Sequence, residues 1–317
     1  MSDNTNSMAI ITICSHLCVG ENVKPFEPGE WSKLAGVLYG KSFQPKDLLA
    51  FSNNDFVNIF GFDLKQSERL SRLIDRSGSI AFEIEKYENM GIKIVTRSDD
   101  HYPKKLKKIL KNHCPPLFYY TGKLDVFEKS FVGFVGSRDI GQDDIYFAQK
   151  MIDKVIAHGF SIVSGGAKGI DSISRERALK NGSIVIEYIS DSLLKKLKDK
   201  EIVSAIKSGK LTIMSVAKPD AGFNVGMSMM RNKYIYAQSI GTVVVKSDYN
   251  RGGTWNGAME NLKNNWCCEF CWDNSSYAGN MELIKNGAIP IDENWSADVT
   301  SYKRIDNTKD LQISLFE

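Results

Sequence analysis

The sequence has few of the features that mark membrane, secreted or metal-binding proteins. No stretch of its 317 residues reaches the roughly 18 consecutive apolar residues that a membrane-spanning helix needs. Six cysteines are too few for a disulfide framework in a chain of this length, and the four histidines are scattered along it. The N-terminal segment shows neither a basic leader nor a small-residue cleavage site. These absences predict a globular protein in a reducing cytoplasm, with no membrane partner.

A strong charge of either sign is also missing. The 41 Lys and Arg against 38 Asp and Glu give a formal net charge of +3. Such a balance excludes a surface that is basic all over, but it permits a local basic patch for nucleic acid. The 42% hydrophobic and 25% charged residues are ordinary for a globular chain with room for about two domains.

The pattern of apolar residues changes near residue 90. Before it, apolar residues recur at helical spacing, as at Trp31, Leu34 and Leu38, and only the run 9–13 has strand character. We therefore expect a small helical (SAM-like) domain over residues 1–90. After it, short apolar runs alternate with helical segments, which predicts an α/β domain over 91–291 with a Rossmann-like, doubly wound, mostly parallel sheet. The polar stretch 292–317 is expected to be a flexible tail. The expected strands of the core are SFVGFVGS (130–137), FSIVSGG (160–166), SIVIEYI (183–189), LTIMSV (211–216), GTVVVKS (241–247) and WCCEFCW (266–272).

Small residues and a cation follow each of the first two core strands. Gly136, Ser137 and Arg138 follow one strand, and the turn 164–171 with Lys168 follows the next. Ligands of open parallel sheets bind beyond the carboxyl ends of the strands. Glycines let the backbone approach a ligand, and the N–H groups at the start of the next helix face an anion. The pattern predicts a phosphate site; glycines that serve only tight packing remain the alternative.

Six motifs give the chain a specific resemblance. They are G-S-R at 136–138, S-G-G-A-K-G-I-D at 164–171, A-L-K-N-G at 178–182, R-N-K at 231–233, R-G-G-T-W-N-G-A at 251–258 and D-D-H-Y-P-K-K-L at 99–106. In order and spacing they resemble the DNA-processing protein A (DprA/Smf) family, over roughly residues 25–290. The C-terminal winged-helix module of many family members is not expected here.

The resemblance implies a protein that binds single-stranded DNA and acts in DNA processing or recombination, without covalent chemistry or a cofactor. Arg138 and Lys168 would capture phosphate, Arg231 and Lys233 would line the groove, and Asp171 would orient the turn. A RecA-type recombinase and a second copy of the chain are the implied protein partners. The DNA- and phosphate-binding residues that it assigns are Gly136, Ser137, Arg138, Ser164, Gly165, Gly166, Lys168, Gly169, Arg231, Asn232, Lys233, Gly253 and Thr254.

Two further patterns bear on other site chemistries. A nucleotide sensor or nucleoside-phosphate hydrolase could use the same turn, with Glu260 of GGTWNGAME as the candidate carboxylate, although neither G-x-G-x-x-G nor G-K-[ST] is present. Cys267, Cys268 and Cys271 lack a second ligand pair for zinc, so buried thiols are expected and no metal.

The last residues carry a separate pattern. Gln312, Leu315 and Phe316 match a Q-x-x-L-F peptide, which resembles the segment with which bacterial DNA proteins dock on the replicative sliding clamp. Packing of this segment on its own domain is the alternative.

Overall fold

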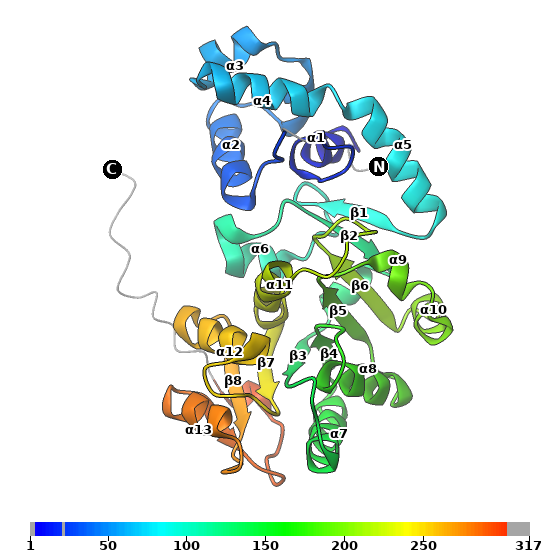
Figure 1. Cartoon of the computed structure of the whole chain (residues 1–317), viewed down its shortest axis with the longest axis vertical. Helices are drawn as coiled ribbons and strands as arrows, with labels where there is room; N and C mark the ends of the chain where they lie inside the picture. Colours follow the sequence, from blue (N-terminus) through cyan, green and yellow to red (C-terminus); the bar gives the residue numbers. More distant parts are fainter. Residues whose placement is uncertain (1–3, 21–22, 303–317) are drawn as a thin grey trace. The chain divides into compact units, whose positions relative to one another are not determined.

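The computed structural model describes residues 4–20 and 23–302, and the chain divides into two compact units (Figure 1). Residues up to 128 together with 186–228 form the first unit. Residues 129–185 together with those from 229 onward form the second. Among the described residues, no helix combines the length and the apolar character needed to cross a membrane.

The first unit begins with helices. Before the first strand lie α1 (Asn4–Cys14), α2 (Pro28–Gly40), the 3-10 turn η1 (Pro45–Ala50), α3 (Asn53–Phe60), α4 (Leu64–Ile74) and α5 (Ser77–Asn89). The run 9–13, expected as strand-like, belongs to α1, so that expectation is wrong. Residues 9–14 of this helix are all buried. A helix buried on every side shows no polar face, and its sequence then cannot be told from that of a buried strand.

The strands of the first unit are hydrogen-bonded in the order β1-β2-β6-β5. Strand β2 is antiparallel to both β1 and β6. The elements of this part are β1 (Lys93–Thr96), α6 (Lys104–Leu110), η2 (Lys111–His113), β2 (Leu117–Thr121), η3 (Asp125–Glu128), β5 (Val185–Ile189), α9 (Leu193–Lys196), α10 (Lys200–Lys207) and β6 (Leu211–Ser215).

The second unit contains a wholly parallel set of strands in the order β4-β3-β7-β8-β9. All residues of β3 and β4 are buried, which explains why their sequences are apolar without alternation. The elements are β3 (Phe131–Val135), α7 (Gln142–Ala157), β4 (Ser161–Ser164), α8 (Ile170–Lys180), α11 (Val225–Gln238, of this unit from 229), β7 (Ser239–Val244), α12 (Gly252–Asn264), β8 (Cys268–Trp272), α13 (Ala278–Lys285), β9 (Ile289–Ile291) and η4 (Val299–Ser301).

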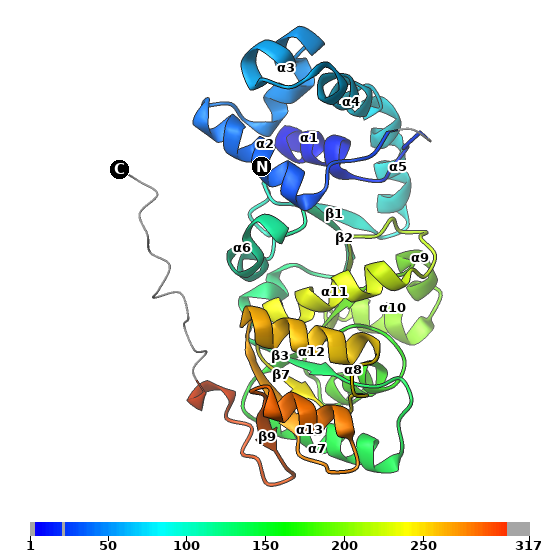
Figure 2. The same ribbon diagram turned by 60° about the vertical axis from the view of Figure 1, so that its left-hand side comes forward.

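The chain reverses its direction across this sheet between β3 and β7. From β3 it proceeds through α7 to β4 on one side, and from β7 it proceeds through α12 and α13 to β8 and β9 on the other. Because such crossovers are right-handed, the two sets of helices cover opposite faces. Figure 1 shows α7 and α8 on one side of these strands, and Figure 2 shows α12 and α13 together on the other. The expected α/β class with a Rossmann-like, mostly parallel sheet is confirmed.

Residues 292–302, expected as the start of a flexible tail, pack on the second unit. The Trp295 ring lies 4.7 Å from that of Phe270, and Val299 is buried. The Lys154 Nζ donates to the Trp295 carbonyl at 2.8 Å. Two large apolar side chains among polar neighbours are enough to anchor such a segment, although they give it no periodicity.

Candidate functional site

The turn that joins β4 to α8 is built on glycines with positive φ. Gly166 has φ 65° and Gly169 has φ 76°, conformations that side chains with a Cβ rarely adopt. Gly169 is the residue directly before helix α8. The sequence therefore forms the expected strand–turn–helix unit, with the first N–H groups of α8 at the carboxyl end of β4.

The segment that follows β3 packs directly against this turn. A Cβ on Gly169 would overlap the Ser137 carbonyl oxygen and lie 2.7 Å from the Cα of Arg138. A Cβ on Gly136 would overlap the side chain of Ile170. The Ile170 N–H also donates to the Ser137 carbonyl at 3.3 Å. Both glycines are therefore required for the close approach of the two strand ends.

This contact places two cations on adjacent backbones. Arg138 and Lys168 are both exposed. Lys168 is bonded to Gly169, and Gly169 lies against the backbone of Arg138. The two side chains therefore start from neighbouring points at the carboxyl end of the sheet, where both can reach one anion.

Backbone donors remain at the same turn. The Ala167 N–H is bound by Asp171 Oδ2 at 3.1 Å, as expected for a residue that orients the turn. The N–H groups of Lys168 and Gly169 have no acceptor among the residues that the structure describes. Two amides beside two cations at a helix start form an anion-binding arrangement.

Arg231 lies under the turn and does not line an open groove. Its guanidinium occupies the space that a Cβ on Gly165 would take, and only 6% of the residue is exposed. Its Nη1 lies 3.9 Å from Asp171 Oδ2, and both side chains are buried. The fully buried Ser164 ends strand β4 directly before Gly165. The arginine therefore supports the turn from within.

The remaining residues assigned by the resemblance lie on α11 and at the start of α12. The Asn232 Nδ2 donates to the Gly253 carbonyl at 2.8 Å and so joins the two helices. Residues two apart on a helix point about 200° apart, so Lys233 faces away from the side on which Arg231 lies. Its Nζ lies 5.5 Å from the Tyr234 ring centroid. Thr254 is half-buried in the first turn of α12.

Sequence reasoning missed Lys246, two residues after the end of β7. Its carbonyl accepts from the Ser137 N–H at 3.0 Å, and its Nζ donates to the Asp139 carbonyl at 2.9 Å. The Nζ also lies 3.4 Å from the buried carboxylate of Asp144. The sequence GTVVVKS shows a lysine near the end of a strand, but only the position of β7 beside β3 reveals that this lysine lies next to the Arg138 segment.

The nucleotide-hydrolysing and metal-binding alternatives have little support in the geometry. Glu260 is exposed, eight residues into α12, and thus about 12 Å along the axis from its start. Cys267 and Cys271 are buried, and burial raises the pKa of the Cys271 thiol. Within residues 4–20 and 23–302, no three His, Cys, Asp or Glu side chains are grouped so that they could hold a metal ion.

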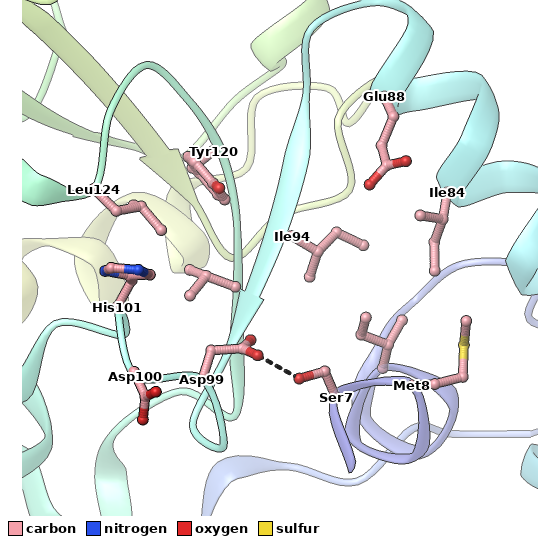
Figure 3. Close-up of a pocket in the computed structure, with 12 residues that line it drawn as sticks. Ser7, Met8, Ile84, Glu88, Ile94, Asp99, Asp100, His101, Tyr120 and Leu124 are labelled. Atoms are coloured by element: carbon pink, nitrogen blue, oxygen red, sulfur yellow. Dashed lines mark hydrogen bonds between the residues drawn. The ribbon is translucent and has the colours of Figure 1, made fainter. Parts of the chain in front are cut away.

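A separate pocket of about 400 Å³ lies within the first unit (Figure 3). Its lining includes the carboxylates of Glu88, Asp99 and Asp100. The Ser7 Oγ donates to Asp99 Oδ1 at 2.6 Å, and the Thr96 N–H donates to Asp99 Oδ2 at 2.6 Å. Carboxylates repel phosphates, so this pocket is a poor site for nucleic acid in spite of its volume.

Comparison with known proteins identifies relatives of this chain. The DNA processing protein DprA of Streptococcus pneumoniae is 37% identical over 95 residues, which cover 30% of this chain and 33% of that relative. The crystal structure of DprA from S. pneumoniae matches with a TM-score of 0.69 at 21% identity, over 92% of this chain and 95% of that one.

A second solved structure shares the fold. It is the DNA processing protein A from Helicobacter pylori, described for its single-stranded DNA binding mode. It matches with a TM-score of 0.52 at 23% identity, over 63% of this chain and 90% of that one. The model of the family named DNA recombination-mediator protein A matches residues 93–300, well over half of the sequence. The chain therefore belongs to the DNA recombination-mediator protein A family.

Proposed function

We propose that this protein binds single-stranded DNA at the carboxyl ends of β3 and β4 and acts in DNA processing or recombination, without covalent chemistry. The observation that carries the proposal is the packing of Gly169 against Arg138, which puts two exposed cations and two backbone amides at one place. In this proposal Arg138, Lys168 and Gly169 contact phosphate. Gly136, Ser137, Ser164, Gly165, Gly166 and Arg231 shape the turn, and Asn232, Gly253 and Thr254 extend the site. Lys233, on the side of α11 turned away from Arg231, has no part in this phosphate site.

The chemistry of the turn suits a nucleic-acid backbone. Exposed cations contact phosphate with little regard to base identity. Such binding weakens as the salt concentration rises, because the release of counterions from the DNA then becomes less favourable. Backbone N–H groups add direction without sequence selectivity. A protein that handles DNA strands of any sequence requires binding of this kind, which does not depend on the bases.

Replacing either cation tests the site. We expect Arg138→Ala and Lys168→Ala each to weaken binding of a single-stranded oligonucleotide about tenfold or more, because each removes a charge-assisted contact. The slope of log K against log salt should become less steep by about 0.7 for each lost contact. Fluorescence anisotropy over a salt series measures both quantities. Lys180→Ala, at the far end of α8, is the matched control.

Unchanged affinity in both variants, with wild-type melting curves, would remove the site from consideration. The same titration should include duplex DNA and a mononucleotide. A mononucleotide that binds as tightly as the oligonucleotide, or that loses its base on incubation, would instead support the nucleotide-sensing or hydrolytic function.

Further partners belong to the same proposal. Family membership supports a RecA-type recombinase and a second copy of this chain as partners, in the cytoplasm where single-stranded intermediates of DNA arise. The Q-x-x-L-F pattern of Gln312, Leu315 and Phe316 supports tethering to the sliding clamp. These three residues lie outside the described part of the chain.

A further inference from the structure

The loop after β7 lies at the point where the chain reverses direction across the sheet. Strands β3 and β7 are neighbours, yet the chain leaves them toward opposite sides. Open α/β sheets bind their ligands beyond the carboxyl ends of the strands at such a reversal. Residues 136–138 follow β3 at this place, and the loop 245–251 follows β7.

Hydrogen bonds hold these two segments side by side. The Val245 N–H donates to the Val135 carbonyl at 3.0 Å, and the Ser137 N–H donates to the Lys246 carbonyl at 3.0 Å. These bonds continue the hydrogen-bond ladder between β3 and β7 beyond the ends of the two strands. Neighbouring strands of a sheet lie about 4.8 Å apart. Arg138 lies one residue beyond the last bond and Tyr249 three residues beyond it.

Tyr249 is an exposed aromatic ring with an anchored position. It is 58% exposed, although large aromatic side chains are usually covered. Its ring meets that of Trp255 edge to face, at 5.3 Å between centroids and an interplanar angle of 76°. Trp255 is only 7% exposed and belongs to the first turn of α12. The edge contact holds the tyrosine ring in place.

We propose that Tyr249 is a base-stacking residue of the single-stranded DNA site, with Trp255 as its positioning residue. The inference rests on the proposed function and adds a contact to the bases, whereas Arg138 and Lys168 serve the phosphates. Every base has a π-face, so stacking on one ring strengthens binding without demanding a sequence. It also restricts the ligand to strands whose bases are unpaired.

The test separates base contacts from phosphate contacts. The wild-type chain, Tyr249→Ala, Tyr249→Phe and Tyr146→Ala are titrated with a dT oligonucleotide and with an abasic oligonucleotide of the same length. Tyr146 is a matched control because it is 57% exposed but lies on α7. Thermal melting establishes that all four chains are folded.

We expect Tyr249→Ala to lose about fivefold to a hundredfold in affinity for the dT oligonucleotide and nothing for the abasic one. Tyr249→Phe keeps the ring and should bind both as the wild-type chain does. Equal loss on both oligonucleotides, or no loss on either, would overturn the stacking role. If the wild-type chain binds neither oligonucleotide, the proposed function itself fails. If the wild-type chain binds but the Tyr249 substitutions leave both affinities unchanged, the phosphate site stands without this residue.

Discussion

At the scale of single residues, two glycines with similar φ angles have different reasons to be glycine. Gly159 has φ 83° and Gly169 has φ 76°. A Cβ on Gly159 would meet no atom within 4 Å, whereas one on Gly169 would meet the backbone of Ser137 and Arg138. Gly159 is required only by its dihedral angle, whereas Gly169 is also required by the close approach of two strand ends.

Alanine at these two positions should therefore have unequal costs. Gly159→Ala should lower the free energy of unfolding by about 1 kcal/mol, the typical penalty for a left-handed backbone. Gly169→Ala should cost roughly 2–4 kcal/mol, because backbone atoms cannot yield as a flexible side chain can. Urea denaturation followed by circular dichroism measures both values. Equal losses would mean that the strand ends are not in contact.

At the scale of elements, β8 and α12 bury a carboxyl group between them. Glu269 of β8 is 3% exposed and accepts from the Asn261 Nδ2 of α12 at 2.9 Å. Burial raises the pKa of this carboxyl to about 8, while the Asn261 hydrogen bond opposes the shift. Near neutral pH the group is therefore largely protonated in the folded chain and ionised in the unfolded one.

Stability should consequently fall as the pH rises from about 5 through about 8. In this window the folded state holds a proton on Glu269 that the unfolded state has released, so raising the pH favours unfolding. We expect Glu269→Gln to flatten this slope, because the amide cannot ionise. Denaturation midpoints at unit intervals of pH measure the effect, with Glu260→Gln on exposed α12 surface as the control. A slope unchanged in Glu269→Gln would show that another group titrates.

At the scale of the whole molecule, DNA binding and clamp binding are assigned to separate parts of the chain. All the residues proposed for DNA belong to the second unit, while the Q-x-x-L-F pattern occupies the last residues of the sequence. Deleting residues 311–317 should abolish binding to a purified bacterial sliding clamp and leave the affinity for single-stranded DNA unchanged. Surface plasmon resonance with both ligands measures this, and Leu315→Ala with Phe316→Ala repeats it without shortening the chain. Loss of both activities together would indicate that the segment is structural.

The sequence alone predicted the α/β architecture and the first two strand ends. Apolar runs such as 131–135 reflect burial on both sheet faces, and burial is recorded locally in residue type. The glycines of 164–169 likewise reflect a local backbone requirement. These features could be predicted because each depends on neighbours in the chain.

The tertiary structure decided which residues meet. Only the fold places the guanidinium of Arg231 against Gly165, the ammonium group of Lys246 beside the Asp139 carbonyl, and the carboxyl of Glu269 out of water. It also anchors Trp295 and its neighbours, whose composition is that of a loop. Each of these outcomes depends on contacts between segments far apart in sequence, and residue type or spacing within one segment carries no record of them.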